Sequence, residues 1–297
     1  MIVFALIVGL VLERLATSVL HLRELRWFDR YYDIGIRFIG RWPRIGVYFG
    51  LLLIIAGPVL PVLGVSLWLR DPDWSFWDPA YFGFAALTIL FCLGPRDLGS
   101  EVNEYCDARD RGDDDAADRV LLEMSESADP RKDDIEVVED AIFVQSNNRI
   151  FGVIFWFFLL GPVGAWLFRV SDMLRRRVVY EHRRSGGGRD SVLVAIEAIY
   201  GLLKWIPARL AILGYALAGS FDDAMNVWRG DIDYGGKPID ERNDMLIARV
   251  GKAAMTGYLD EPANSGAAAR NSMRIVRRTV FMWVSVIALL TLFGWTL

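Results

Sequence analysis

The sequence predicts an all-α, polytopic membrane protein, and three observations carry that prediction. The chain has 297 residues, of which 54% are hydrophobic, and its mean hydropathy is +0.29. A soluble domain of this length is usually less apolar. Several stretches approach or exceed the roughly 20 apolar residues that a membrane-spanning helix needs. The charged residues are collected in blocks between these stretches, which is the pattern of membrane helices joined by polar segments.

Four segments are predicted to span the membrane: 1–20, 45–69, 79–95 and 279–297. The first is interrupted by Glu13 and Arg14, and the second carries two prolines that should kink it. The third segment qualifies as a membrane span only as a short or tilted helix.

Two further segments, 150–168 and 205–219, are predicted to be membrane-embedded but broken or amphipathic. The first is interrupted at Gly161-Pro162. Before the second, Glu197, Gly201, Lys204 and Ala208 fall on one helical stripe, which predicts an interfacial amphipathic helix. Pro207 should break or kink this path.

Charge distribution predicts the orientation, because short cytoplasmic loops are enriched in Lys and Arg. Block 21–44 holds six Arg against three acids and should be cytoplasmic, as should the acidic helical region 96–148. The equally basic block 171–190 would fall outside if 150–168 crossed once. We therefore favour a re-entrant hairpin at Gly161-Pro162, allowed where protein shields the backbone from lipid. The alternative is that 150–168 and 205–219 both cross.

These segments divide the chain into five regions. The first two are an N-terminal membrane region (1–95) and the acidic cytoplasmic helices (96–148). A membrane-embedded region with a basic loop follows (149–220). The last two are a cytoplasmic region that ends in the small-residue linker "ANSGAAAR" (221–278) and a C-terminal span (279–297).

Motifs for metal, cofactor or nucleic-acid chemistry are weak. Two Cys and two His supply neither a disulfide framework nor a zinc site. The run Asp113-Asp114-Asp115 is better interpreted as a helix cap than as a metal site. "SGGGRD" (185–190) lacks the phosphate-loop pattern and favours a flexible hinge. No metal, cofactor, nucleic-acid partner or catalytic residue is predicted.

Charged side chains in or beside apolar segments are the candidate site, since such groups are costly in a bilayer and face partners. Either they form ion pairs between helices, or they converge on a polar cavity for an anionic ligand, such as a cell-wall fragment or a nucleotide. The candidates are Glu13, Arg14, Arg149, Glu197, Lys204 and Arg209. Arg209 could instead reach a lipid phosphate.

Several stretches resemble the AmpE family of bacterial inner-membrane proteins, within the CobD/CbiB cobinamide-phosphate synthase superfamily. "KWIPARL" (204–210) resembles a W-x-P-A-R-L element of that superfamily. "LERL" (12–15), the Gly-Pro segment 147–174, "AIYGLLKWIPARLAILGYALAG" (198–219) and "VIALLTLFG" (286–294) resemble AmpE segments in the same order. The resemblance implies a multi-pass inner-membrane regulator or sensor linked to cell-wall recycling and β-lactamase induction.

The chain departs from the synthases at two motifs. It has Gln145-Ser146 and Phe151-Gly152 where the synthases carry Glu-Asn and Asp-Gly, and 240–257 lacks their Ser-Pro-Asn-Ala-Gly element. Groups for Mg²⁺ and phosphate are thus missing. The sequence favours a non-enzymatic sensor. The alternatives are an ATP-dependent amide ligase of the synthase type, or a scaffold for a membrane or cytoplasmic protein partner.

Overall fold

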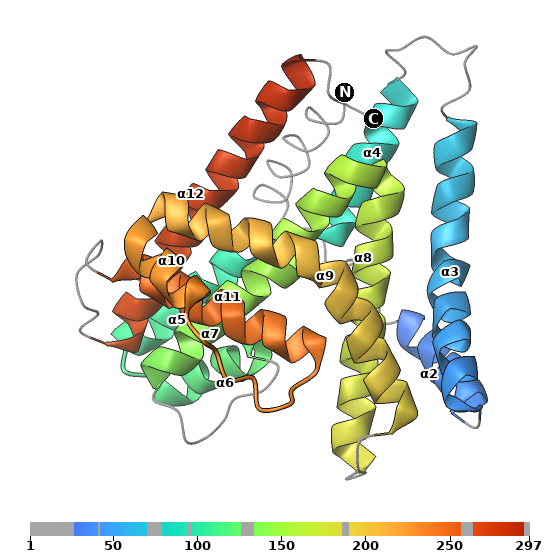
Figure 1. The fold of residues 1–297 in the computed structure, drawn as a ribbon, viewed down its shortest axis with the longest axis horizontal. Helices are drawn as coiled ribbons and strands as arrows, with labels where there is room; N and C mark the ends of the chain where they lie inside the picture. Colours follow the sequence, from blue (N-terminus) through green and yellow to red (C-terminus); the bar gives the residue numbers. More distant parts are fainter. Residues whose placement is uncertain are drawn as a thin grey trace.

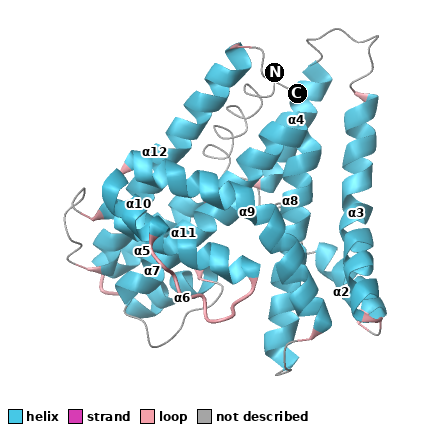
Figure 2. Cartoon of the chain, in the orientation of Figure 1, coloured by secondary structure: helices cyan, strands magenta, loops and turns pink. Residues whose placement is uncertain are grey.

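The computed structural model describes residues 27–40, 42–69, 79–93, 97–125, 134–185, 190–256 and 264–293, and these contain helices and no strand (Figures 1 and 2). The predicted all-α class is confirmed. The predicted span 1–20 lies outside the described residues. The helices are α2 (Trp27–Ile39), α3 (Arg44–Trp68), α4 (Pro79–Cys92), α5 (Leu98–Asp110), α6 (Asp114–Met124), α7 (Asp134–Ser146), the π-helix η2 (Asn147–Phe151), α8 (Gly152–Ser185), α9 (Ser191–Ala218), α10 (Phe221–Arg229), α11 (Ile239–Met255) and α12 (Ser265–Leu292).

Among the described residues, four helical stretches are long and apolar enough to cross a membrane: 44–68, 135–184, 191–218 and 265–292. The first matches the predicted span 45–69, and the last contains the described part of 279–297. The predicted span 79–95 forms α4, whose 14 residues reach only about 21 Å at 1.5 Å per residue. The chain is therefore a helical membrane protein, with α4 as a short apolar helix among longer ones.

The stretch 135–184 is not one straight rod, because the chain reverses at Gly161. Gly161 has φ 64° and ψ −150°, a backbone conformation that is open to glycine and strained for other residues. A Cβ at Gly152 would lie 2.2 Å from the Phe168 ring, and one at Gly164 would lie 2.2 Å from the Trp156 carbonyl oxygen. Residues on either side of the turn thus pack face to face in a helical hairpin. This is the chain path that the sequence favoured at Gly161-Pro162.

The hairpin brings two arginine-rich blocks to the same end of the molecule. After the turn, α8 descends past α2, and Arg177 forms a two-pronged ion pair with Asp33, with both N–O distances at 2.8 Å. The pKa of Asp33 is lowered, mainly because Arg177 donates hydrogen bonds to the carboxylate, and burial opposes this effect. The described parts of blocks 21–44 and 171–190 are therefore neighbours, which removes the conflict that a single crossing of 150–168 would create.

Helix α9 runs unbroken through Pro207, so of the two predicted effects of this proline, a break or a kink, the break is wrong. Proline has no N–H and leaves the carbonyl four residues earlier, that of Leu203, without its helical donor. The indole Nε1 of Trp156 donates to this oxygen at 3.0 Å. The hairpin thus supplies the missing hydrogen bond. Figure 1 shows that α9 changes direction along its length but stays helical.

The same solution recurs in α3, where Pro58 leaves the Ile54 carbonyl free. The hydroxyl of Tyr31, on α2, donates to this oxygen at 2.9 Å. In both helices a neighbouring side chain keeps a proline-containing membrane helix continuous.

A helical body lies beside the hairpin, formed by α5, α6, α7, α10, α11 and the first half of α12 (Figure 1). Asp113 caps α6 by accepting from the Ala116 N–H at 3.0 Å, as its interpretation as a helix cap requires. The prediction that "ANSGAAAR" forms a linker is largely wrong, because α12 begins at Ser265. Asn264 caps that helix at Ala267, and three consecutive alanines favour helix strongly.

Candidate functional site

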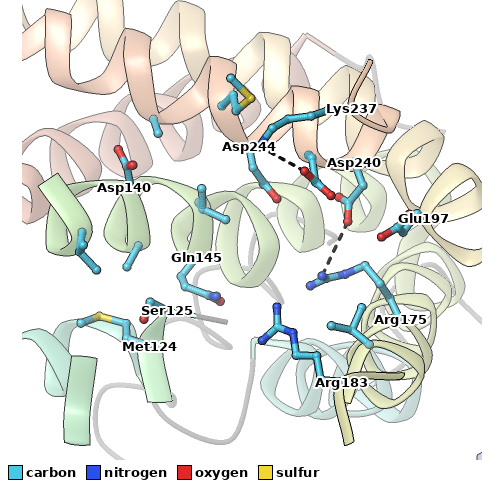
Figure 3. Close-up of a pocket in the computed structure, with 17 residues that line it drawn as sticks. Met124, Ser125, Asp140, Gln145, Arg175, Arg183, Glu197, Lys237, Asp240 and Asp244 are labelled. Carbon is cyan, nitrogen blue, oxygen red and sulfur yellow. Dashed lines mark ion pairs between the residues drawn. The ribbon is translucent and has the colours of Figure 1, made fainter. Parts of the chain in front are cut away.

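A cavity of about 440 Å³ lies where the helical body meets the hairpin and α9 (Figure 3). Its walls come from the end of α6 and from α7, α8, α9 and α11. Arg175, Arg183 and Lys237 contribute basic groups, and five acids line the same space: Asp140, Glu197, Asp240, Glu241 and Asp244. Charges of both signs therefore face the cavity, with carboxylates in excess.

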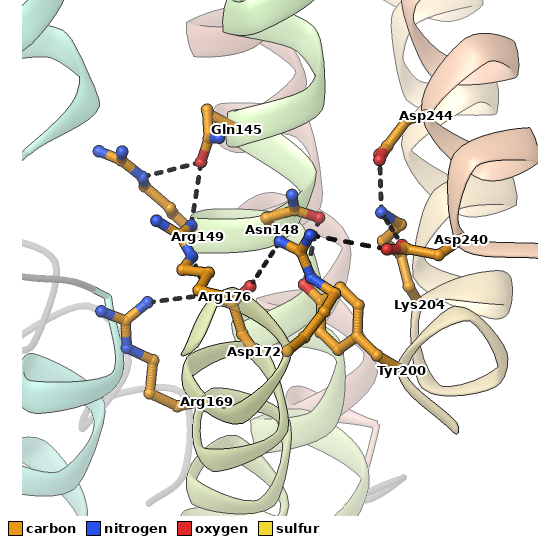
Figure 4. A network of polar contacts seen from close by, with 11 residues as sticks. Gln145, Asn148, Arg149, Arg169, Asp172, Arg176, Tyr200, Lys204, Asp240 and Asp244 are labelled. Atoms are coloured by element: carbon orange, nitrogen blue, oxygen red, sulfur yellow. Dashed lines mark hydrogen bonds and ion pairs between the residues drawn. The ribbon is translucent and has the colours of Figure 1, made fainter. Parts of the chain in front are cut away.

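One wall of the cavity is the edge of a buried ion network centred on Asp172 of α8 (Figure 4). Asp172 is fully buried and accepts from three arginines on its own helix. The distances are 3.2 Å to Arg169, 3.2 Å to Arg175 and 2.9 Å to Arg176. Arg175 continues to Asp240 of α11 at 3.7 Å. The network therefore crosses from α8 to α11 beside the cavity.

Lys204 of α9 is the second centre of the network and is completely buried. It forms ion pairs with Asp240 and, at 2.7 Å, with Asp244. The two acids are four residues apart and so share one face of α11. The close approach of α9 and α11 depends on Gly201, where a Cβ would lie 2.2 Å from the Ile239 side chain and 2.7 Å from the Asp240 backbone nitrogen.

Asp244 faces the cavity, and its side chain keeps 26% exposure. Burial raises the pKa of Asp244 to about 7, with the negative charge of Asp240 in the same direction and Lys204 opposing. A carboxyl group with such a pKa changes charge near neutral pH. The site can therefore respond to protonation or to a charged ligand.

The network reaches the base of the hairpin through two routes. Arg175 and Lys204 both lie over the Tyr200 ring, at 4.9 and 5.2 Å, and the Tyr200 hydroxyl donates to Asn148 at 3.2 Å. In the second route Gln145, which lines the cavity, accepts from Arg149 at 3.0 Å and from Arg176 at 3.1 Å. Asn148 and Arg149 belong to η2, and π-helical turns are frequent at functional sites.

The predicted site residues are distributed unevenly around this cavity. Glu197 lines it, and Lys204 and Arg149 each bind a residue that lines it. Arg149 also forms a buried ion pair with Glu101 at 2.7 Å. Arg209 is not part of the cavity wall and binds Asn243 on α11. Glu13 and Arg14 lie outside the described residues.

The predicted site residues did not include Asp172, Arg175, Asp240 and Asp244. Spacing was the available signal, because an acid with arginines three and four residues away shares a helix face with them. The block 171–190 was interpreted instead as loop-like basic charge. Nothing local indicated that Asp240 and Asp244 meet Lys204 about 40 residues earlier, since that contact depends on how α11 packs.

The fold and the site together define a class: a helical membrane protein with a charged cavity beside an apolar helical hairpin, joined to it by a buried ion network. The comparisons agree with this class. The family described as "Regulatory signalling modulator protein AmpE" matches residues 1–297. The chain belongs to the AmpE family of regulatory signalling modulators.

Two relatives are similar at low identity. "Protein AmpE" of Shigella flexneri is 22% identical over 286 residues, covering 92% of this chain and 88% of that protein. "Cobalamin biosynthesis protein CobD" of Stutzerimonas stutzeri is 27% identical over 155 residues. That match covers 51% of this chain and only 50% of the relative. No solved structure matches this chain.

Proposed function

We propose that this protein is a multi-pass regulator in the bacterial inner membrane whose output depends on a small charged ligand in the cavity. The single observation that carries the proposal is that the cavity wall and the buried ion network share residues. Arg175, Asp240 and Asp244 belong to both. A ligand that competes for these groups changes the network at once, and allostery requires such differential contacts.

The charges of the wall favour a ligand that carries both carboxylate and ammonium groups. Arg175 and Arg183 would hold a carboxylate, since the guanidinium fork matches its geometry. Glu197 and Asp244 would accept an ammonium group. The peptide part of an anhydro-muropeptide has this chemistry, and the AmpE resemblance links the family to cell-wall recycling and β-lactamase induction.

The proposed readout passes from the cavity to the hairpin. Loss of the Asp244 contact would leave Lys204 with Asp240 alone and change its position over Tyr200. The Tyr200–Asn148 hydrogen bond then transmits the change to η2. A protein partner that contacts the hairpin or the helical body would sense it.

A thermal-shift titration of the full chain in detergent tests the proposal. A ligand that binds only the folded state at 100 times its Kd adds about 2.7 kcal/mol to the free energy of unfolding. We expect such a shift with an anhydro-muropeptide, and we expect Glu197→Gln and Asp244→Asn to reduce it. Glu136→Gln is the matched control, because Glu136 is exposed on α7 outside the cavity wall. A shift unchanged in both cavity variants would overturn the proposed site.

The alternative is a nucleotide-using amide ligase, which the CobD similarity favours. A shift with Mg-ATP, lost in Asp240→Asn, would support the ligase and exclude the sensor. No shift with either compound would favour a scaffold that binds a protein partner.

Orientation is tested by labelling single cysteines with a membrane-impermeant reagent. Native Cys92 and Cys106 are both buried, so the wild-type chain is a weakly reactive background. Arg37→Cys and Arg184→Cys should both react in inside-out vesicles and stay protected in intact cells, if both basic blocks are cytoplasmic. Opposite protection of the two sites would contradict this orientation.

A further inference from the structure

The second half of α9 presents an apolar stripe to the outside of the molecule. Its members recur at spacings of three and four residues and are between 37% and 65% exposed. They are Leu202, Trp205, Ile206, Leu210, Leu213 and Leu217. The opposite face of the helix is buried against the protein. In a helix that is apolar enough to lie in a membrane, this stripe faces lipid.

Arg209 lies on the same face of α9 as this apolar stripe. At 100° per residue it falls between Trp205 and Leu213 around the helix axis. Helical side chains lean toward the N-terminus, and the Arg209 guanidinium lies 4.6 Å from the Trp205 ring centroid. It also donates to the Asn243 side chain and, at 3.4 Å, to the Trp205 carbonyl oxygen.

All these partners are neutral, and within the described part of the chain Arg209 has no carboxylate partner. Two other predicted site cations differ, since Lys204 binds two acids and Arg149 binds Glu101. Arg209 is half-buried. A partly desolvated charge without a counter-ion is costly, so an anion from outside the chain would stabilise it.

A second arginine adjoins the hydrogen-bond partner of Arg209 in the sequence. The exposed Arg242 of α11 stacks 5.8 Å from the Tyr234 ring centroid, and Tyr234 is near enough to interact electrostatically with Arg209. Asn243, the hydrogen-bond partner of Arg209, is the next residue. Arg209 and Arg242 therefore both interact with Tyr234, beside the apolar stripe.

We propose that Arg209, Arg242 and Trp205 form a binding site for the headgroup phosphate of an anionic phospholipid. The arginine forks bind the phosphate oxygens, the partly exposed indole occupies the interfacial layer, and the stripe of α9 packs along the acyl chains. This site is distinct from the cavity and does not depend on the function proposed for it.

Native mass spectrometry of the full chain in detergent, titrated with phosphatidylglycerol, tests the site. We expect one phosphatidylglycerol to bind more tightly than phosphatidylcholine, and Arg209→Gln to weaken it by about tenfold or more, the range of a lost charge-assisted hydrogen bond. Arg242→Gln should weaken binding less. Arg119→Gln is the matched control, because Arg119 is an exposed arginine on α6 in the helical body.

Three results would overturn the proposal: equal affinity for the two lipids, equal effects of Arg209→Gln and Arg119→Gln, or equally tight binding of soluble glycerophosphate. The last would assign the anion to a free phosphate compound. Arg209→Lys controls for misfolding of the glutamine variant, because lysine keeps the positive charge but lacks the two-pronged guanidinium group. It should bind phosphatidylglycerol with intermediate affinity, and wild-type affinity in this variant would exclude the two-pronged contact.

Discussion

Replacing Lys204 by methionine is the sharpest test of the ion network. Lys204 is completely buried and forms ion pairs with Asp240 and Asp244. Methionine fills much of the same volume but removes the cation that binds Asp244 and leaves Asp240 with its longer contact to Arg175, at 3.7 Å. Removing one partner of a buried ion pair costs about 3–5 kcal/mol. We expect Lys204→Met to lower the free energy of unfolding by that amount at pH 8.

The variant's cost should depend on pH. Burial already raises the pKa of Asp244 to about 7, and Lys204 opposes that rise. Without Lys204 the pKa of Asp244 rises further, so the carboxyl group is neutral at pH 5.5 and needs no cation. The destabilisation should therefore be smaller at pH 5.5 than at pH 8.

Thermal unfolding followed by tryptophan fluorescence measures this effect, because the chain contains eleven Trp. Lys252→Met is the matched control. Lys252 also binds an acid, Asp140 at 2.8 Å, but both side chains are partly exposed, at 27% and 23%. Such a pair contributes about 0–1 kcal/mol. Equal Tm losses for the two variants at pH 8 would refute the buried network as a stabilising unit.

Three further predictions concern the hairpin and the cavity. Trp156→Phe should lower the free energy of unfolding by about 1–2 kcal/mol, because it leaves a carbonyl of α9 without a donor. The loss should be smaller in a Pro207→Ala background, where the helix regains its own N–H. Additive losses in the double variant would contradict this reasoning. Gly152→Ala should lower the Tm because its Cβ would meet the Phe168 ring at 2.2 Å, whereas Gly64→Ala, with open space around it, should not. For Asp244 the folded-state pKa of about 7 exceeds the ordinary value of 3.8. The folded state therefore holds the proton more tightly, and this group's contribution to stability falls as pH rises from about 4 to 7. The Tm of Asp244→Asn relative to wild type should accordingly rise between pH 5 and pH 8, and a flat difference would show that the carboxyl group titrates normally.

The sequence by itself determined the helical class and the features that depend on neighbouring residues. Apolar runs of sufficient length predicted α3 and the last span, since burial in a bilayer depends on composition and length. Asp113 was predicted to cap a helix, because the side chain at this position can accept from the backbone N–H three residues later. The stripe of Glu197, Gly201, Lys204 and Ala208 predicted an interfacial amphipathic helix, whereas in the structure all four residues are buried against the protein. The Gly-Pro pair at 161–162 predicted the reversal, because few other residues tolerate that backbone conformation.

The tertiary structure alone decided which charges meet and which proline bends rather than ends a helix. Pro207 predicted either a break or a kink because its local effect is to remove a hydrogen bond, and only the position of Trp156, about 50 residues earlier, replaces that bond. Arg177 meets Asp33 across 144 residues, and Lys204 meets Asp240 and Asp244 only because Gly201 lets α11 approach. Arg209, near Lys204 in sequence, faces outward instead. Local patterns give the face of a helix, whereas its partners depend on packing between segments that the sequence does not place side by side.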